Sequence, residues 1–288
     1  MLQKSAAKVS IDGQGKAIVE TDMTDIGTGT YTILGQITAE ILGLPIEDVT
    51  VHLGDTDAPP GAGSGGSWGA ASSGSSVYLA CEALRKKIAS AMDVDEAGMT
   101  LKDGRVIAEN RSVRLRELVG TGMAATGEIS AGHQEKTFNQ ASYGAHFCEV
   151  AVNAITGEVR VKRMLGVFTA GRILNEKTAR SQCLGGMTFG IGAALSEELV
   201  HDPRNGKVVN RDLAEYHVPV NADVPQLEVD FLYERDIQAN PLHAKGLGEL
   251  GICGAAAAVG NAIYNATGVR VRDYPLTLDK LLEGLPVM

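Results

Sequence analysis

The segments HFCEVAV (His146–Val152) and EVRVKRMLGV (Glu158–Val167), joined through the turn AITG, decide the fold class of this sequence. Apolar residues alternate with polar residues on both sides of a turn that ends in glycine, which is the pattern of a β-hairpin. A second hairpin is predicted where Val9–Ile11 and Ala17–Thr21 flank the turn Asp12–Gly15. Antiparallel pairs are therefore expected in the sheets of this protein.

Helical periodicity fills much of the sequence between and after these hairpins. Tyr31–Leu42 and Val77–Met92 place apolar residues three and four positions apart. Thr178–Leu199 is predicted to be a helix rich in glycine and alanine, which permits another backbone to approach closely. Gly254–Ala266 is almost uniformly apolar, so we expect a helix that is buried on all sides. Shorter elements are predicted at Val49–Leu53 and Leu227–Leu232 (strands) and at Leu276–Leu282 (helix).

The stretch 93–142 is patterned more weakly. It predicts a strand near Arg105–Ile107, a short helix at Val113–Val119 and a polar region with glycines at 120, 122, 127 and 132, and it suits a subdomain border or a surface excursion. Hairpins and helices are mixed without a strict strand–helix–strand repeat, so the fold class is α+β. We expect one region over residues 1–288, with two mixed α/β subdomains of about 1–130 and 140–288 whose packing is intertwined.

The composition of the 288-residue chain excludes several classes of function. Hydrophobic residues make up 44% and charged residues 21%, which suits a packed core and argues against global disorder. The net charge of −9 argues against nucleic acid or an anionic membrane as a partner, because both favour a basic surface. The sequence contains no apolar run of about eighteen residues and no apolar segment at its start, so neither a membrane span nor a secretory signal is expected.

Cysteine and histidine spacing gives no metal site. The four cysteines lie far apart without a C-x-x-C pair, so we expect free thiols, with neither a zinc ribbon nor an iron–sulfur cluster on this chain. His146, His217 and His243 lack the spacing of metal ligands and are interpreted as structural histidines. No residue of the chain is therefore predicted to ligate a metal.

Glycine supplies 35 of the 288 residues, above its usual share of about 7%. Such an excess favours tight turns, or backbone that lies close to another group. Gly27-Thr28-Gly29-Thr30 stands before a predicted helix and is either an anion site, using the free N–H groups of the helix N-terminus, or a simple turn. Residues 61–76 surround Trp68 with glycine and serine, and they form either a flexible linker or a second set of N–H donors.

The segment Lys245-Gly246-Leu247-Gly248-Glu249-Leu250-Gly251 carries the sharpest local pattern. A carboxylate between glycines, just before an apolar helix, is costly to bury without a partner. Desolvation would raise the pKa of Glu249 and suit a general base, whereas a position at the helix N-terminus would make Glu249 a capping residue. Gln182, in Ser181-Gln182-Cys183, is by itself interpreted as a polar residue in the first turn of its helix.

Taken together, five segments resemble one family. TDMTDIGTGTYT, GDTDAPPGAGSGGSWGA, ARSQCLGGMTFGIGAALSEEL, AEYHVPVNADVPQLEV and KGLGELGICGAAAAVGNAIYNATGVRVRDYPLTLDKLL occur in the order found in the xanthine oxidase family of molybdenum hydroxylases. They resemble the C-terminal half of the molybdenum-binding large subunit, as in the bacterial aldehyde oxidoreductases that use molybdopterin cytosine dinucleotide. The resemblance covers essentially the whole chain, and the segments around Glu249 and Gln182 are specific in combination.

The resemblance implies a role for each matching position. Glu249 corresponds to the active-site glutamate, the general base in the oxidation of an aldehyde to a carboxylic acid with water as the oxygen source. Thr28 stands where the family often has glutamine. The glycine excess is accordingly interpreted as backbone brought close to a large phosphate-bearing cofactor. The positions that would contact molybdopterin are Gly27, Thr28, Gly29, Thr30, Gly66, Ser67, Trp68, Gly69, Ala70, Ser181, Gln182, Cys183, Lys245, Gly246 and Gly248.

The resemblance also implies partners. The N-terminal half of the large subunit would complete the molybdenum site, and [2Fe-2S] clusters and FAD would reside on partner chains. The chain, either a fragment or a naturally split subunit, would then be inactive alone. Its location would be cytoplasmic, or periplasmic if a partner carried an export signal. Two alternatives remain: a hydroxylase of an N-heterocycle such as a purine or nicotinate, and a non-catalytic module for cofactor binding or assembly.

Overall fold

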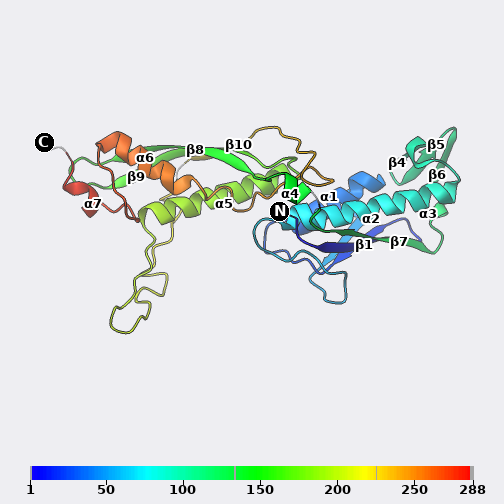
Figure 1. Cartoon of the computed structure of the whole chain (residues 1–288), viewed down its shortest axis with the longest axis horizontal. Coiled ribbons are helices and arrows are strands. Elements are labelled where there is room, and N and C mark those ends of the chain that lie inside the picture. Colours follow the sequence, from blue (N-terminus) through cyan, green and yellow to red (C-terminus); the bar gives the residue numbers. More distant parts are fainter. Residues whose placement is uncertain (1, 133, 225, 286–288) are drawn as a thin grey trace. The chain divides into compact units, whose positions relative to one another are not determined.

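A computed structural model describes residues 2–132, 134–224 and 226–285 (Figure 1). The chain forms two compact units. Unit 1 consists of Met1–Ala141, Ala170–Asn175 and Glu234–Gly246, and unit 2 consists of Ser142–Thr169, Glu176–Tyr233 and Leu247–Met288. Each unit has its own hydrophobic core. Each is therefore built from segments that are distant in the sequence.

Unit 1 is organised around a four-stranded sheet of order β3-β2-β1-β7. The predicted N-terminal hairpin is confirmed, with β1 (Ser5–Asp12) antiparallel to β2 (Ala17–Thr21). Strand β3 (Val49–Leu53) pairs in parallel with β2. Strand β7 (Gly122–Ile129) pairs with β1 along its whole length, so a regular strand occupies the stretch for which only a polar region with glycines was expected.

Helices α1 (Thr30–Leu42) and α2 (Gly69–Met92) pack against this sheet. Helix α2 begins at Gly69 rather than at the predicted Val77, so the linker interpretation of residues 61–76 is wrong over its second half. The serines of the first turns are fully buried, because their hydroxyl groups find partners. Ser5 Oγ lies 3.1 Å from Ser73 Oγ and 3.2 Å from Ser76 Oγ, which joins α2 to β1.

A small meander completes unit 1. Strands β4 (Met99–Lys102), β5 (Arg105–Ala108) and β6 (Arg111–Arg114) form an antiparallel sheet. The helix predicted at Val113–Val119 is shorter than expected, because β6 takes its first residues and only α3 (Leu115–Leu118) is helical. The remaining short helices of unit 1 are η1 (Ile46–Asp48), η2 (Glu96–Gly98) and α4 (Gln134–Thr137).

Unit 2 is built on the second predicted hairpin. Strand β8 (Tyr143–Val152) pairs antiparallel with β9 (Val159–Thr169), and β10 (Gln226–Phe231) adds in parallel on the other side of β9. Helices α5 (Glu176–Leu195) and α6 (Ala255–Thr267) pack on this sheet and on each other (Figure 1). The short helix α7 (Asp279–Leu282) follows.

Two predictions for the helices of unit 2 need correction. Helix α5 ends at Leu195 instead of Leu199, and the described residues after it, up to β10, form turns with an isolated bridge. Helix α6 is buried along one stripe, at Ala255, Val259 and Ile263, and not on all sides. None of the helices in the described ranges is long and apolar enough to cross a membrane.

Candidate functional site

The two glycine-rich loops of the sequence lie side by side in unit 1. The first loop is defined as residues 22–31, and the second loop as residues 59–69. The backbone N–H of Asp22 donates to the carbonyl of Pro59 at 2.9 Å, and the Asp22 carboxylate accepts from the N–H of Gly61. Chain segments almost forty residues apart in sequence thus form one surface.

The first loop already contains an anion of its own. Asp25 Oδ1 accepts from the N–H of Gly27 at 2.8 Å, and Asp25 Oδ2 accepts from the N–H of Tyr31 at 3.2 Å. Burial by itself would raise the pKa of Asp25, but hydrogen bonds from the backbone at Gly27, Tyr31, Gly29 and Thr28 outweigh it and hold the pKa below its usual value. The N–H groups at the start of α1 therefore bind a carboxylate of the same chain, whereas one interpretation of the sequence expected them to be free for a phosphate.

The second loop is folded tightly around its tryptophan. Trp68 Nε1 donates to the carbonyl of Ala62 at 3.0 Å, and the indole covers Gly66, where an added Cβ would lie 2.2 Å from a ring carbon. Helix α2 then starts at Gly69 with no acidic residue in its first turn, and the side chain of its N-cap residue, Trp68, makes no capping hydrogen bond. The first N–H groups of a helix have no intrahelical partner, so this end of α2 can accept a negative charge.

Gly246 joins the second loop through a close backbone contact. A side chain at position 246 would place its Cβ 2.7 Å from the carbonyl oxygen of Ser67, so glycine is required there. Ser67 itself adopts a left-handed backbone conformation, with φ of 56°. The structure thus brings the predicted cofactor positions 66–70 against position 246 within unit 1.

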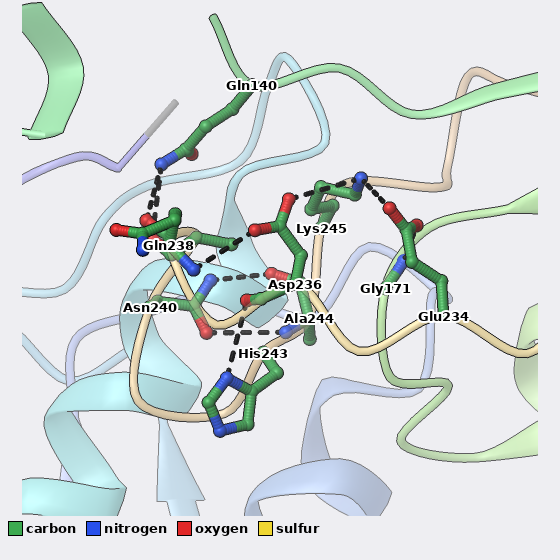
Figure 2. Close-up of polar contacts among 10 residues, drawn as sticks. Gln140, Gly171, Glu234, Asp236, Gln238, Asn240, His243, Ala244 and Lys245 are labelled. Atoms are coloured by element: carbon green, nitrogen blue, oxygen red, sulfur yellow. Dashed lines mark hydrogen bonds and ion pairs between the residues drawn. The ribbon is translucent and has the colours of Figure 1, made fainter. Parts of the chain in front are cut away.

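Lys245, whose side chain is buried, forms ion pairs with two partly exposed carboxylates (Figure 2). Its side chain is only 8% exposed, and Nζ lies 2.8 Å from a carboxylate oxygen of Glu234 and 3.4 Å from one of Asp236. Its backbone N–H donates to the carbonyl of Ala170 at 2.7 Å. Sequence analysis missed Glu234 and Asp236, because nothing in their local pattern separates them from solvated acidic residues.

Hydrogen bonds from side chains of the segment itself and from Gln140 also brace the backbone between Asp236 and Lys245 (Figure 2). Asn240 Oδ1 accepts from the N–H of Leu242 at 3.0 Å, and Gln140 Nε2 donates to the carbonyl of Gln238 at 3.1 Å. His243 Nδ1 lies 3.3 Å from the carbonyl oxygen of Asp236, and this histidine is therefore structural, as predicted.

In unit 2, Glu249 lies at the exposed tip of a turn. Leu247 and Leu250 on either side pack against the core, and the N–H of Leu250 donates to the carbonyl of Leu247 at 2.9 Å. Helix α6 begins at Ala255 with Gly254 as its N-cap, so the interpretation of Glu249 as a helix cap is wrong. The expectation that Glu249 is desolvated is also wrong, because its side chain is exposed.

The Glu249 turn packs against α5 beside the predicted Ser181–Cys183 segment. An added Cβ on Gly251 would lie 2.5 Å from the carbonyl oxygen of Cys183, so the two backbones are in direct contact. Gln182 lies half-buried within α5, and not in its first turn, because the helix starts at Glu176. The Cys183 thiol points into the core, where burial raises its pKa to about 11.

The thiols and the acidic residues offer no separate metal site. All four cysteines, each within the described part of the chain, are free. The residues that the structure describes contain no cluster of three or more His, Cys, Asp or Glu side chains able to hold a metal ion.

Comparison with known proteins identifies relatives of the whole chain. Residues 1–225 match the family model of the molybdopterin cofactor-binding domain. The chain is 55% identical to the aldehyde oxidoreductase molybdenum-binding subunit PaoC of Escherichia coli (strain K12), over 99% of the chain and 39% of that subunit. It is 34% identical to the putative xanthine dehydrogenase molybdenum-binding subunit XdhA of the same organism, over 97% of the chain and 39% of that subunit. The chain thus spans about two fifths of the length of these relatives.

A solved structure shares the fold. Quinoline 2-oxidoreductase from Pseudomonas putida 86 superposes with a TM-score of 0.87 and 25% sequence identity, over 99% of this chain and 38% of that chain. The mixed α/β architecture of both units is therefore one already known from experiment.

Proposed function

Because the chain belongs to the molybdopterin cofactor-binding domain family, within the xanthine oxidase group of molybdenum enzymes, we propose that it forms part of the active site of an aldehyde-oxidising enzyme. The product would be a carboxylic acid, with water as the oxygen source. Two findings support this assignment: the match over residues 1–225, and 55% identity to a subunit named as an aldehyde oxidoreductase.

Since the chain spans 39% of that relative, we propose that further chain completes the site. The N-terminal half of the large subunit would supply the rest of the molybdenum pocket. Subunits that carry [2Fe-2S] clusters and FAD would remove the electrons. The chain alone is then inactive.

In unit 1, the start of α2 fits the phosphates of a cofactor better than the start of α1 does. The start of α2 has no acidic residue in its first turn, and the folded second loop presents glycine backbone beside it. The start of α1 is occupied by the Asp25 carboxylate, which would repel a phosphate. We therefore assign the cofactor phosphates, in the cytosine dinucleotide form, chiefly to Gly66–Ala70 and α2, and a neighbouring backbone contact to Gly27–Thr30.

Glu249 is the residue that we assign as the general base. When bound, the molybdenum cofactor supplies the two-electron oxidation. The Glu249 carboxylate takes up the proton that is released as the water-derived oxygen adds to the substrate carbon. The observation that carries this role is its placement: Glu249 is an exposed carboxylate on a turn whose two leucines pack against the core and whose Gly251 backbone contacts Cys183 of α5. Lys245, Gly246 and Gly248 hold the loop, and Gln182 contacts the pterin.

The decisive experiment is Glu249→Gln in the enzyme assembled with its partner subunits. Loss of the proton acceptor should lower kcat by at least about 100-fold, while molybdenum and pterin contents stay at the unsubstituted level. Glu198→Gln, an exposed glutamate on the loop after α5, is the matched control and should leave kcat unchanged. Near-normal turnover of Glu249→Gln would overturn the assignment.

Hydroxylation of an N-heterocycle is the second candidate. The solved structure with a TM-score of 0.87 is named a quinoline 2-oxidoreductase, and a 28% identical relative is named the nicotine 6-hydroxylase large subunit. A substrate panel on the assembled enzyme separates the two candidates, because aldehydes should give the higher kcat/KM if the first is correct.

A further inference from the structure

His146 occupies an inward-facing position of β8 that would ordinarily hold an apolar residue. Its neighbours on the same face, Cys148 and Val150, pack against the core of unit 2. The imidazole lies edge-on to the fully buried ring of Phe168, with ring centroids 5.1 Å apart and an interplanar angle of 68°. The ring is therefore held firmly in one orientation, as expected for a packed aromatic pair.

The two nitrogens of His146 face the turn that follows Glu249. Nε2 lies 2.9 Å from the carbonyl oxygen of Gly251, and since a carbonyl only accepts, Nε2 carries the proton and donates it. On the other side of the ring, an added Cβ on Gly254 would lie 2.5 Å from Nδ1. The ring thus touches both ends of the segment that connects Glu249 to α6.

The imidazole is a neutral donor. Burial lowers the pKa of His146, and the hydrogen bond to Gly251 only partly opposes this shift. A neutral ring holds the Gly251 carbonyl without placing a positive charge near the Glu249 carboxylate. Such a charge would favour the ionised carboxylate and weaken it as a base.

The same turn also contacts α5. Gly251 contacts the backbone of Cys183, and an added Cβ on Gly186 would lie 2.7 Å from the backbone nitrogen of Ile252. The backbone two and three residues after Glu249 therefore contacts both α5 and His146. Van der Waals contact limits how near the turn can come to α5, and the hydrogen bond fixes the distance between Gly251 and His146.

We infer that His146 is a positioning residue for Glu249, acting through the carbonyl of Gly251. The inference rests on the proposed role of Glu249 as the general base. A displacement of about 1 Å in a catalytic group can lower turnover by about 100-fold, so a hydrogen bond to the backbone two residues after Glu249 is sufficient to matter.

The test compares His146→Leu with His146→Gln in the assembled enzyme. Leucine keeps the apolar bulk and removes the donor, whereas the glutamine amide keeps a donor of similar reach. His146→Leu should lower kcat by about 10-fold or more with KM within about twofold, and His146→Gln should restore at least half of the turnover. Val150→Ala is the matched control, because it removes packing from the same face of β8 and leaves the bond to Gly251 intact.

A second measurement does not depend on activity. Hydrogen–deuterium exchange of peptides covering residues 247–254 should accelerate in His146→Leu, and it should stay near the unsubstituted rate in His146→Gln and Val150→Ala. Should His146→Leu fold poorly, Gly254→Ala displaces the ring from the other side and should give the same loss of kcat.

The outcomes separate this inference from the proposed function. Suppose that Glu249→Gln is inactive. If His146→Leu then turns over normally, or if His146→Gln turns over no faster than His146→Leu, the positioning role is overturned and the base assignment stands. If Glu249→Gln remains active, both are overturned. In the double variant, His146→Leu should add little to the loss caused by Glu249→Gln, since the two residues act as one unit.

Discussion

Replacing Lys245 with methionine tests whether its ion pairs with Glu234 and Asp236 hold the segment 234–246 in place. The substitution leaves Glu234 and Asp236 without the ammonium group that lies 2.8 and 3.4 Å from them. Removing one partner of a fully buried ion pair costs about 3–5 kcal/mol. The two carboxylates keep 26% and 23% of their side-chain surface exposed, so water offsets part of this cost, and we expect a loss of about 2–3 kcal/mol.

Native-state hydrogen exchange of the full-length subunit measures this loss locally. The N–H of Lys245 bonds to Ala170 and that of Arg172 bonds to His243, and both report on opening of the segment. At about 1.4 kcal/mol for each factor of ten, these amides should exchange about 30- to 150-fold faster in Lys245→Met.

The control variant neutralises all three residues of these ion pairs. Lys245→Met combined with Glu234→Gln and Asp236→Asn keeps the shape and removes the unpaired charges, and it should recover most of the protection. Equal deprotection in the single and the triple variant would refute the electrostatic argument. Unchanged exchange in Lys245→Met would show that the ion pairs do not hold the segment at all.

Two further predictions concern the helix N-termini of unit 1. Ala70→Asp adds a negative charge to the first turn of α2 and should lower the cofactor content of the assembled enzyme several-fold. Ala70→Asn introduces a neutral side chain of similar size and should leave the cofactor content unchanged. Equal pterin and molybdenum contents in the two variants would contradict a phosphate site at the start of α2. Asp25→Ala should reduce the free energy of unfolding by about 1 kcal/mol, because α1 loses its anion. Since folding lowers the pKa of Asp25, the ionised carboxylate contributes fully to the free energy of unfolding at neutral pH, and this contribution is lost as the pH falls through the folded-state pKa. The melting temperatures of the native protein and of Asp25→Asn, measured by calorimetry, should therefore converge in acid.

Both hairpins could be located from sequence because their pattern is local. The alternation in β8 and β9 and the glycine turn between them lie within about thirty residues, so no distant information is needed. The start of α2 could not be located in this way. Its buried serines look like linker residues until Ser5, far away in the sequence, is placed beside Ser73 and Ser76.

Strand β7 was missed for a similar reason. An added Cβ on Gly127 would lie 2.2 Å from the carbonyl oxygen of Ser76. Only glycine at this position therefore allows α2 to pack so closely against β7. Part of the glycine excess, at Gly127, Gly186 and Gly251, is thus explained by contacts between segments of the chain itself, and not by a cofactor.

The candidate site was predicted unevenly. The pattern around Glu249 predicted a desolvated carboxylate or a helix cap, and both expectations about its surroundings are wrong, because Leu247 and Leu250 pack against the core and leave the carboxylate exposed. His146 carried no signal at all, since its partner is a backbone carbonyl more than a hundred residues away.

The repeated passage of the chain between the two units has a consequence for biosynthesis. The main sheet of unit 1 lies before residue 142 in the sequence. Its ion pairs are complete only when the segment 234–246, which contains Lys245 and both carboxylate partners, has been synthesised. A nascent chain that stops at Ala141 would therefore expose the surface on which the segment 234–246 packs. Neither unit is one continuous stretch of the sequence, and each gains its last segment, Glu234–Gly246 or Leu247–Met288, only when the final part of the chain has been synthesised.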